Sequence, residues 1–164
     1  MNSDDEGLEG AVEDGSDLAL DRFVFSQGLD VVLNSASQLA SVFGGDLVRA
    51  LVFFAIVRAS VAHLNSRGAL NEQAQDGLFP DSLRRPVSIL GVSQFLSIPY
   101  ETTRRHVLAL VEDGLCRRLS SRQFIVDSAT LARPEITGLS VHMARQLRQL
   151  VRRIESAAKA SGAD

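Results

Sequence analysis

Apolar residues recur along this chain at intervals of three and four positions, between breaks marked by glycine and proline. The first such segment runs from Leu29 to Phe43, and its spacing is typical of one helix face. Gly44-Gly45 ends it, and Asp46 is a candidate N-cap for a second helix that runs to about Asn65. The second segment is apolar nearly all round, so we expect it to be the central helix of the core.

Shorter segments follow around one proline. The stretch "PVSI" (86–89) is β-branched and predicts a single edge strand. Ser88 is a candidate cap for a helix over 89–96, whose apolar positions are Leu90, Val92, Phe95 and Leu96. Ile98-Pro99 ends that helix, because the residue before proline avoids the helical region. The connection 66–85 has no clear period, and we assign it no role.

Proline favours the first turn of a helix, so the next helix is expected from Tyr100 to about Asp113. Gly114 then stands where a left-handed C-terminal cap is expected. The helix has one apolar stripe and one polar side. The predicted buried stripe is Thr103, Val107, Leu110 and Val111, and the opposite side carries Glu101, Arg105, Leu108 and Glu112, flanked by Thr102 and Arg104.

The last third of the chain predicts a hairpin and a helix. "LCRRL" and "QFIVD" are separated by "SSR" and read as two short strands joined by a tight turn. A final helix is expected from Ile136 to about Ala158, opened by Pro134-Glu135 or capped by Thr137. Its near-heptad apolar seam needs a partner, either the chain's own core or a second copy. The seam residues are Leu139, Met143, Leu147, Leu150, Ile154 and Ala157.

Composition fits one compact unit with appendages, since 164 residues with 45% apolar and 23% charged positions are ordinary for a globular domain.

Charge is unevenly distributed along the chain. Of 20 acids, eight lie in residues 1–21, which hold no base, and the 12 that remain face 17 bases, a balance of +5. We therefore predict a disordered acidic tail over 1–22. This tail either keeps the protein soluble or competes with a polyanion for binding to the basic remainder of the chain.

Location follows from the same composition. The amino terminus is acidic where a secretory leader would be basic and then apolar, so a cytoplasmic protein is expected. The most hydrophobic window, 47–64, contains Arg49, Arg58 and His63, and charge at the centre of a membrane helix costs about 2.5 to 3.5 kcal/mol. A buried core helix, without membrane association, is the expectation.

The stretch "VSQFLSIPYETTRRHVLALVEDGLCRR" (92–118) resembles the winged helix-turn-helix of bacterial transcription regulators, of the MarR and GntR type and of the cyclic-AMP receptor group. The resemblance covers about residues 46–127. It implies a mainly α fold with a small β-hairpin wing, in which 23–132 form the winged helix-turn-helix domain with N-terminal helices and 133–164 a dimerisation helix. It also implies a transcription regulator that binds double-stranded DNA. A homodimer is expected from the carboxy-terminal seam or from the helices at 29–65, because two half-sites about one helical turn apart double the contact area.

A recognition helix must bury one face and project the other into a groove about 12 Å wide, where arginine binds guanine. Residues 84–122 hold seven arginines against three acids, as phosphate neutralisation requires. With the resemblance, this selects candidates on the helix and on the hairpin. The predicted DNA-binding residues are Tyr100, Thr102, Arg104, Arg105, Arg117, Arg118 and Arg122, whereas His106 is expected to be a packed or capping residue.

Other chemistry finds little support. The three histidines, His63, His106 and His142, have no metal-ligand spacing, and no phosphate loop or nucleophile motif occurs, so neither an enzyme nor a cofactor is expected. Cys116 is the only cysteine, which excludes an internal disulfide; packing is favoured over oxidation sensing. Two alternative functions stay open. They are a protein-interaction module that retains the fold, and a sensor whose unknown small-molecule effector binds between Phe43, Phe53 and Phe54.

Overall fold

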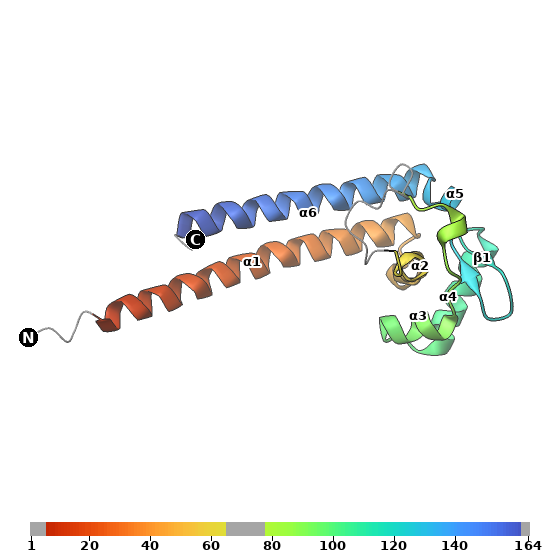
Figure 1. Cartoon of the computed structure of the whole chain (residues 1–164), viewed down its shortest axis with the longest axis horizontal. Coiled ribbons are helices and arrows are strands. Elements are labelled where there is room, and N and C mark those ends of the chain that lie inside the picture. Colours follow the sequence, from red (N-terminus) through yellow and green to blue (C-terminus); the bar gives the residue numbers. More distant parts are fainter. Residues whose placement is uncertain (1–5, 65–77, 162–164) are drawn as a thin grey trace, which may run out of the picture. The chain divides into compact units, whose positions relative to one another are not determined.

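The computed structural model describes the backbone of residues 6–64 and 78–161 and the side chains of 18–64 and 78–160. Of these described residues 73% are helical, and they include one two-stranded antiparallel sheet (Figure 1). Two compact units divide the chain: Met1–Ala36 with Ser140–Asp164, and Ser37–Leu139. The elements are α1 (Glu6–Val42), α2 (Leu47–Val61), the 3-10 helix η2 (Asp81–Leu83), α3 (Ile89–Leu96), α4 (Tyr100–Glu112), β1 (Arg117–Arg118), β2 (Phe124–Ile125), α5 (Ser128–Leu131) and α6 (Pro134–Ser161).

Helix α2 is the centre of the unit Ser37–Leu139, as its sequence predicts. It contacts α3, α4 and β2, and Val52 and Phe53 are fully buried. The backbone N–H of Arg49 donates to Oδ1 of Asp46 (2.9 Å), which confirms the predicted cap. Gly44 and Gly45 have φ of 67° and 89°, so the break before α2 needs glycine. In the described part of the chain, no single helix is long and apolar enough to cross a membrane; only Leu18–Val42 and Leu47–Val61 taken together meet that test.

A three-residue turn joins α3 to α4. The hydroxyl of Ser88 accepts a hydrogen bond from the N–H of Gly91 (3.1 Å), as expected of an N-cap. Ser97 adopts a left-handed conformation (φ 54°), and the hydroxyl of Ser93 donates to the carbonyl of Ile98 (2.7 Å). The predicted bounds of both helices are confirmed to within one residue, because each end has its own cap or proline.

Two of the four apolar positions named for α3 do not lie in the core. Leu90 and Phe95 are exposed, whereas Ile89 and Val92 are buried and Leu96 is partly buried. A helix of eight residues packs through one face only, and that face begins at Ile89. The sequence offered apolar residues on both sides of α3, so their pattern did not select the buried side.

The hairpin forms where the sequence predicts it, with Arg117 paired to Ile125 and Arg118 to Phe124. The predicted edge strand over 86–89 is reduced to a single bridge, in which Val87 and Phe124 exchange two backbone hydrogen bonds of 2.9 Å. Ser88 turns away to cap α3, which stops the strand. Helix α5 was not predicted.

The other unit consists of two helical segments that run antiparallel. Arg153 donates to the side-chain oxygen of Gln27 (2.8 Å), and Ser35 donates to that of Gln146 (3.4 Å). These two pairs fix the opposite directions of α1 and α6 within the unit. The predicted helix from Ile136 to about Ala158 is confirmed; it begins at Pro134, the first of its two opening candidates, and ends slightly later, at Ser161.

The predicted domain boundaries differ from the observed units. Helix α1 begins at Glu6, so most of the segment 1–22, expected to be disordered, is helical; residues 1–5 lie outside the described residues. Acidic side chains at the amino-terminal end of a helix interact favourably with its dipole, so an acidic stretch can continue a helix. The start of α6 belongs with the core instead of a separate helix 133–164, because Ile136 and Leu139 are buried there. The predicted connection 66–85 is described only from Leu78 on.

Candidate nucleic-acid interface

Helix α4 buries one side against the core. Thr103, Val107 and Leu110 are almost completely inaccessible, as predicted. Val111 is only partly buried, and His106 completes the buried side, with its Nδ1 atom 3.4 Å from Oδ2 of Asp46. The hydroxyl of Thr103 donates to the carbonyl of Pro99 (3.2 Å), so this polar residue is satisfied in the interior. His106 is therefore a packed residue.

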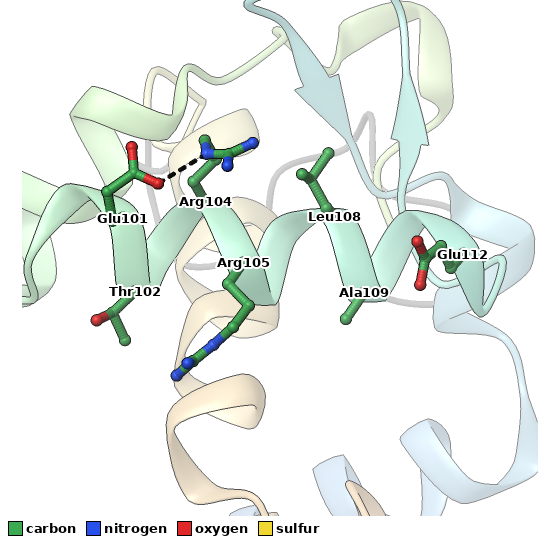
Figure 2. A pocket seen from close by; sticks show the side chains of 7 residues that line it. All are labelled: Glu101, Thr102, Arg104, Arg105, Leu108, Ala109 and Glu112. Carbon is green, nitrogen blue, oxygen red and sulfur yellow. Dashed lines mark hydrogen bonds and ion pairs between the residues drawn. The ribbon is translucent and has the colours of Figure 1, made fainter.

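The outward side of α4 presents two parallel rows of side chains (Figure 2). Glu101, Arg104 and Leu108 point to one side in this view, whereas Thr102, Arg105 and Ala109 point to the other. Positions i, i+3 and i+7 follow the same face of a helix, which explains both rows. Together they line an open hollow of about 540 Å³. The outward side thus offers one cation in each row.

The two arginines differ in what holds them. The Nε atom of Arg104 donates to Oε2 of Glu101 (2.9 Å), and this hydrogen bond raises the pKa of the Arg104 guanidinium (Figure 2). Arg105 is exposed, and within the described residues its side chain makes no hydrogen bond or ion pair. Its five donors are free for a ligand, whereas binding through Arg104 competes with Glu101.

Tyr100 and Arg122 lie at one hollow although they are 22 positions apart. Its volume is about 390 Å³, and Ser88, Ile89, Leu90 and Ser121 complete its lining. The hollow brings together the start of α4, the start of α3 and the tip of the hairpin. The exposed Leu90 is therefore an apolar neighbour of two predicted contact residues, a role that its place among the apolar positions of the helix 89–96 did not indicate.

The hairpin carries the other predicted arginines. Arg117 and Arg118 are both exposed on β1. The Nε atom of Arg118 donates to the carbonyl of Ser120 (3.0 Å), and its guanidinium carbon lies 6.0 Å from the centre of the Phe124 ring. The hydrogen bond that Asp127 accepts from the backbone N–H of Thr130 lowers the pKa of Asp127, and the charge of Arg117 lowers it further by a smaller amount. The hairpin arginines are thus held locally and remain accessible.

One arginine counted in the predicted basic patch does not belong to it. The side chain of Arg84 is 2% exposed, and its Nε atom lies 3.4 Å from Oδ1 of Asp81. Burial lowers its pKa, which shows that desolvation outweighs the nearby carboxylates. Arg84 cannot neutralise phosphate on the surface. Six of the seven arginines between 84 and 122 are exposed: 85, 104, 105, 117, 118 and 122.

The remaining candidates are accounted for by packing. Cys116 lies in the core with its thiol 3.4 Å from the carbonyl of Ile125, and burial raises its pKa to about 11. Phe43, Phe53 and Phe54 pack on one another with ring centres 5.0 to 6.1 Å apart. Among residues 6–64 and 78–161, no group of three metal-binding side chains occurs.

Comparison with family models, with curated proteins and with solved structures finds no match to this chain.

Proposed function

We propose that the chain is a winged helix-turn-helix regulator that binds double-stranded DNA sequence-specifically through α4. The observation that supports this most strongly is the difference between the inner and outer sides of α4. Its inner side is packed and satisfied by Thr103 and His106, while its outer side carries Arg105 with every donor unused in the described structure. A helix anchored on one side and rich in unused donors on the other matches the geometry of major-groove recognition.

In this proposal, Arg105 reads a base and Arg104 binds phosphate or a second base. Arginine pairs with O6 and N7 of guanine in a bidentate manner. The leucine and alanine of the two rows, Leu108 and Ala109, are suited to contact with thymine methyl groups. Thr102 and Tyr100 complete the surface with hydroxyl donors.

The hairpin supplies the flanking contacts. Arg117, Arg118 and Arg122 are exposed there and would bind phosphates beside the groove. Ser88 and Tyr100 line the hollow that Arg122 also borders, so a phosphate on that side meets groups from three elements. Phosphate contacts position the protein on the duplex, whereas the outward side of α4 selects the sequence.

Selection from a pool of random duplexes tests the proposal. The full chain is incubated with the pool at fixed salt, and the retained fragments are sequenced over several rounds. We expect enrichment of one motif and a Kd that rises steeply with salt, by a factor set by the number of phosphates contacted. Retention of no duplex, or retention without sequence enrichment, would contradict sequence-specific regulation.

A second function, a protein-interaction module on the same fold, is favoured by one observation. Phe95 is 64% exposed on α3, and Leu90 is also exposed there. Large apolar residues at a surface are enriched where proteins bind one another. Two results together would favour this second function. The chain would retain no duplex in the selection, and Phe95→Ser would abolish capture of a protein partner.

A further inference from the structure

Helices α1 and α6 face each other through polar side chains in the unit that they form. Arg153 donates to Gln27, and Ser35 donates to Gln146, so side-chain hydrogen bonds join the two helices at two levels. Packed helices usually bury an apolar stripe, which supplies most of their stability. Not one of the described side chains of this unit is buried. Stability therefore does not account for the polar residues at this contact.

A hollow of about 130 Å³ lies along the same contact. A drug-sized ligand needs roughly 300 Å³ or more, so this hollow suits only a small molecule. Of its eight lining residues, two are apolar, and the other six carry an amide or a charge. The six are Gln27, Asp30, Asn34, Gln146, Gln149 and Arg153.

Asp30 and Arg153 bring opposite charges to this hollow without forming an ion pair in the described structure. The side chain of Asn34 donates to the backbone carbonyl of Asp30 (2.9 Å), so the Asp30 carboxylate stays free of hydrogen bonds among the described residues. Arg153 uses one nitrogen atom for Gln27 and keeps its other donors. Because Asp30 lies three residues beyond Gln27, about 4.5 Å along α1, the two charged groups are offset by nearly one helical turn.

The two charges define the class of ligand that fits. A simple anion would be attracted by Arg153 and repelled by Asp30, and a simple cation would meet the reverse. A molecule with a primary ammonium group and a carboxylate satisfies both residues, because its ammonium donates to Asp30 and its carboxylate accepts from Arg153. The side-chain amide of Gln149 makes no hydrogen bond in the described structure and is free to bind a third polar group.

We propose that the hollow between α1 and α6 binds a small polar α-amino acid, with its ammonium group on Asp30 and its carboxylate on Arg153. Both charged groups of an α-amino acid are attached to one carbon atom, so two charge-assisted hydrogen bonds of about 2.8 Å bridge the offset between the helices. The site differs from the pocket expected between Phe43, Phe53 and Phe54, whose rings pack on one another. This inference does not depend on DNA binding, and its test uses the protein alone.

Saturation-transfer NMR of the full chain with L-serine, L-threonine, L-asparagine and L-glutamine, each at millimolar concentration, tests the class of ligand. We expect at least one of them to bind. The N-acetyl derivative of that amino acid has no ammonium group, and its C-terminal amide has no carboxylate, so neither should give saturation transfer. Absence of binding by all four amino acids, or equal binding of either derivative, would overturn the proposal.

Single substitutions test the two contacts. Asp30→Asn and Arg153→Gln should each raise the Kd of the bound amino acid by at least about tenfold, because each removes a charge-assisted hydrogen bond. Asp30→Asn leaves both interhelical bonds in place, so its effect is not a loss of structure. The matched controls are Asp21→Asn and Arg152→Gln, which change exposed residues of the same helices outside the hollow.

We expect an unchanged Kd in both controls, and circular dichroism should show all four variants to be as helical as the unmodified chain. An unchanged Kd in Asp30→Asn or in Arg153→Gln would overturn the site. An equal loss of binding in the controls would overturn it as well, because it would assign the effect to the general charge of the two helices.

Discussion

The Nδ1 atom of His106 lies 3.4 Å from Oδ2 of Asp46, while the other carboxylate oxygen of Asp46 accepts the N–H of Arg49. One side chain thus caps α2 and contacts the buried edge of α4. Arg49 in turn forms an ion pair with Asp113 beyond the end of α4. The helix proposed to bind DNA is therefore linked to the central core helix near its middle and at its end.

Replacement of Asp46 separates its two roles. Asp46→Ala removes the cap and the contact with His106, and we expect the free energy of unfolding to fall by about 1 to 2 kcal/mol. Asparagine caps helices about as well as aspartate, so Asp46→Asn should lose no more than about 0.5 kcal/mol. Urea unfolding at one protein concentration measures both. Equal losses for the two variants would contradict the role of the cap.

Gly114 ends α4 with φ of 64° and has open space around the position of a Cβ atom. The cost of Gly114→Ala is therefore conformational, and we expect a loss of about 1 kcal/mol in unfolding free energy. Gly138 has equally open space but lies within α6, so Gly138→Ala should stabilise the chain by up to about 1 kcal/mol. Thermal unfolding of both variants measures the two changes in stability, which we expect to have opposite signs. Changes in stability of the same sign would contradict the backbone conformations observed at Gly114 and Gly138.

The Cys116 thiol has a pKa of about 11, raised by burial from an ordinary value near 9. Because the neutral thiol is the favoured form in the fold, its contribution to stability is complete below pH 9 and is lost as pH rises from 9 to 11. At pH 8, we expect a disulfide reagent to react roughly a hundredfold more slowly with the folded chain than with the chain in urea. Equal rates would show that Cys116 is accessible.

Arg105 and Arg104 should contribute unequally to binding of a selected duplex. Arg105→Ala removes donors that are free in the described structure, and we expect a loss of about 1 to 3 kcal/mol with relaxed specificity at one base pair. Arg104→Ala should cost less, because binding through Arg104 must compete with Glu101. Fluorescence anisotropy at fixed salt measures both. A larger loss for Arg104 would reverse the assigned roles.

Local sequence signals predicted the middle of the fold well. Ser88, Pro99 and Gly114 each act through the chain next to them, so the bounds of α3 and α4 follow from propensities and caps alone. The same holds for the buried side of α4, since Thr103, Val107 and Leu110 follow the helical period.

Predictions that depend on distant packing succeeded less often. The exposure of Leu90 and Phe95 is set by which side of α3 meets α2, and no local pattern encodes that choice. The burial of Arg84 likewise depends on how residues 78–87 fold over the core. The period of the segment Leu29–Phe43 predicted a helix face but not its exposure; Val32 and Leu33 are exposed although they share that period with buried Phe43.

The binding of one selected duplex by the chain with Arg104→Ala and Arg105→Ala combined tests the central claim most directly. Arg145→Ala, which removes an exposed arginine from α6, is the matched control. At equal salt, we predict that the double variant loses at least about tenfold in affinity, that its salt dependence falls by up to about two phosphate contacts, and that the control binds normally. Unchanged affinity and salt dependence in the double variant would contradict the assignment of α4 as the DNA-binding helix.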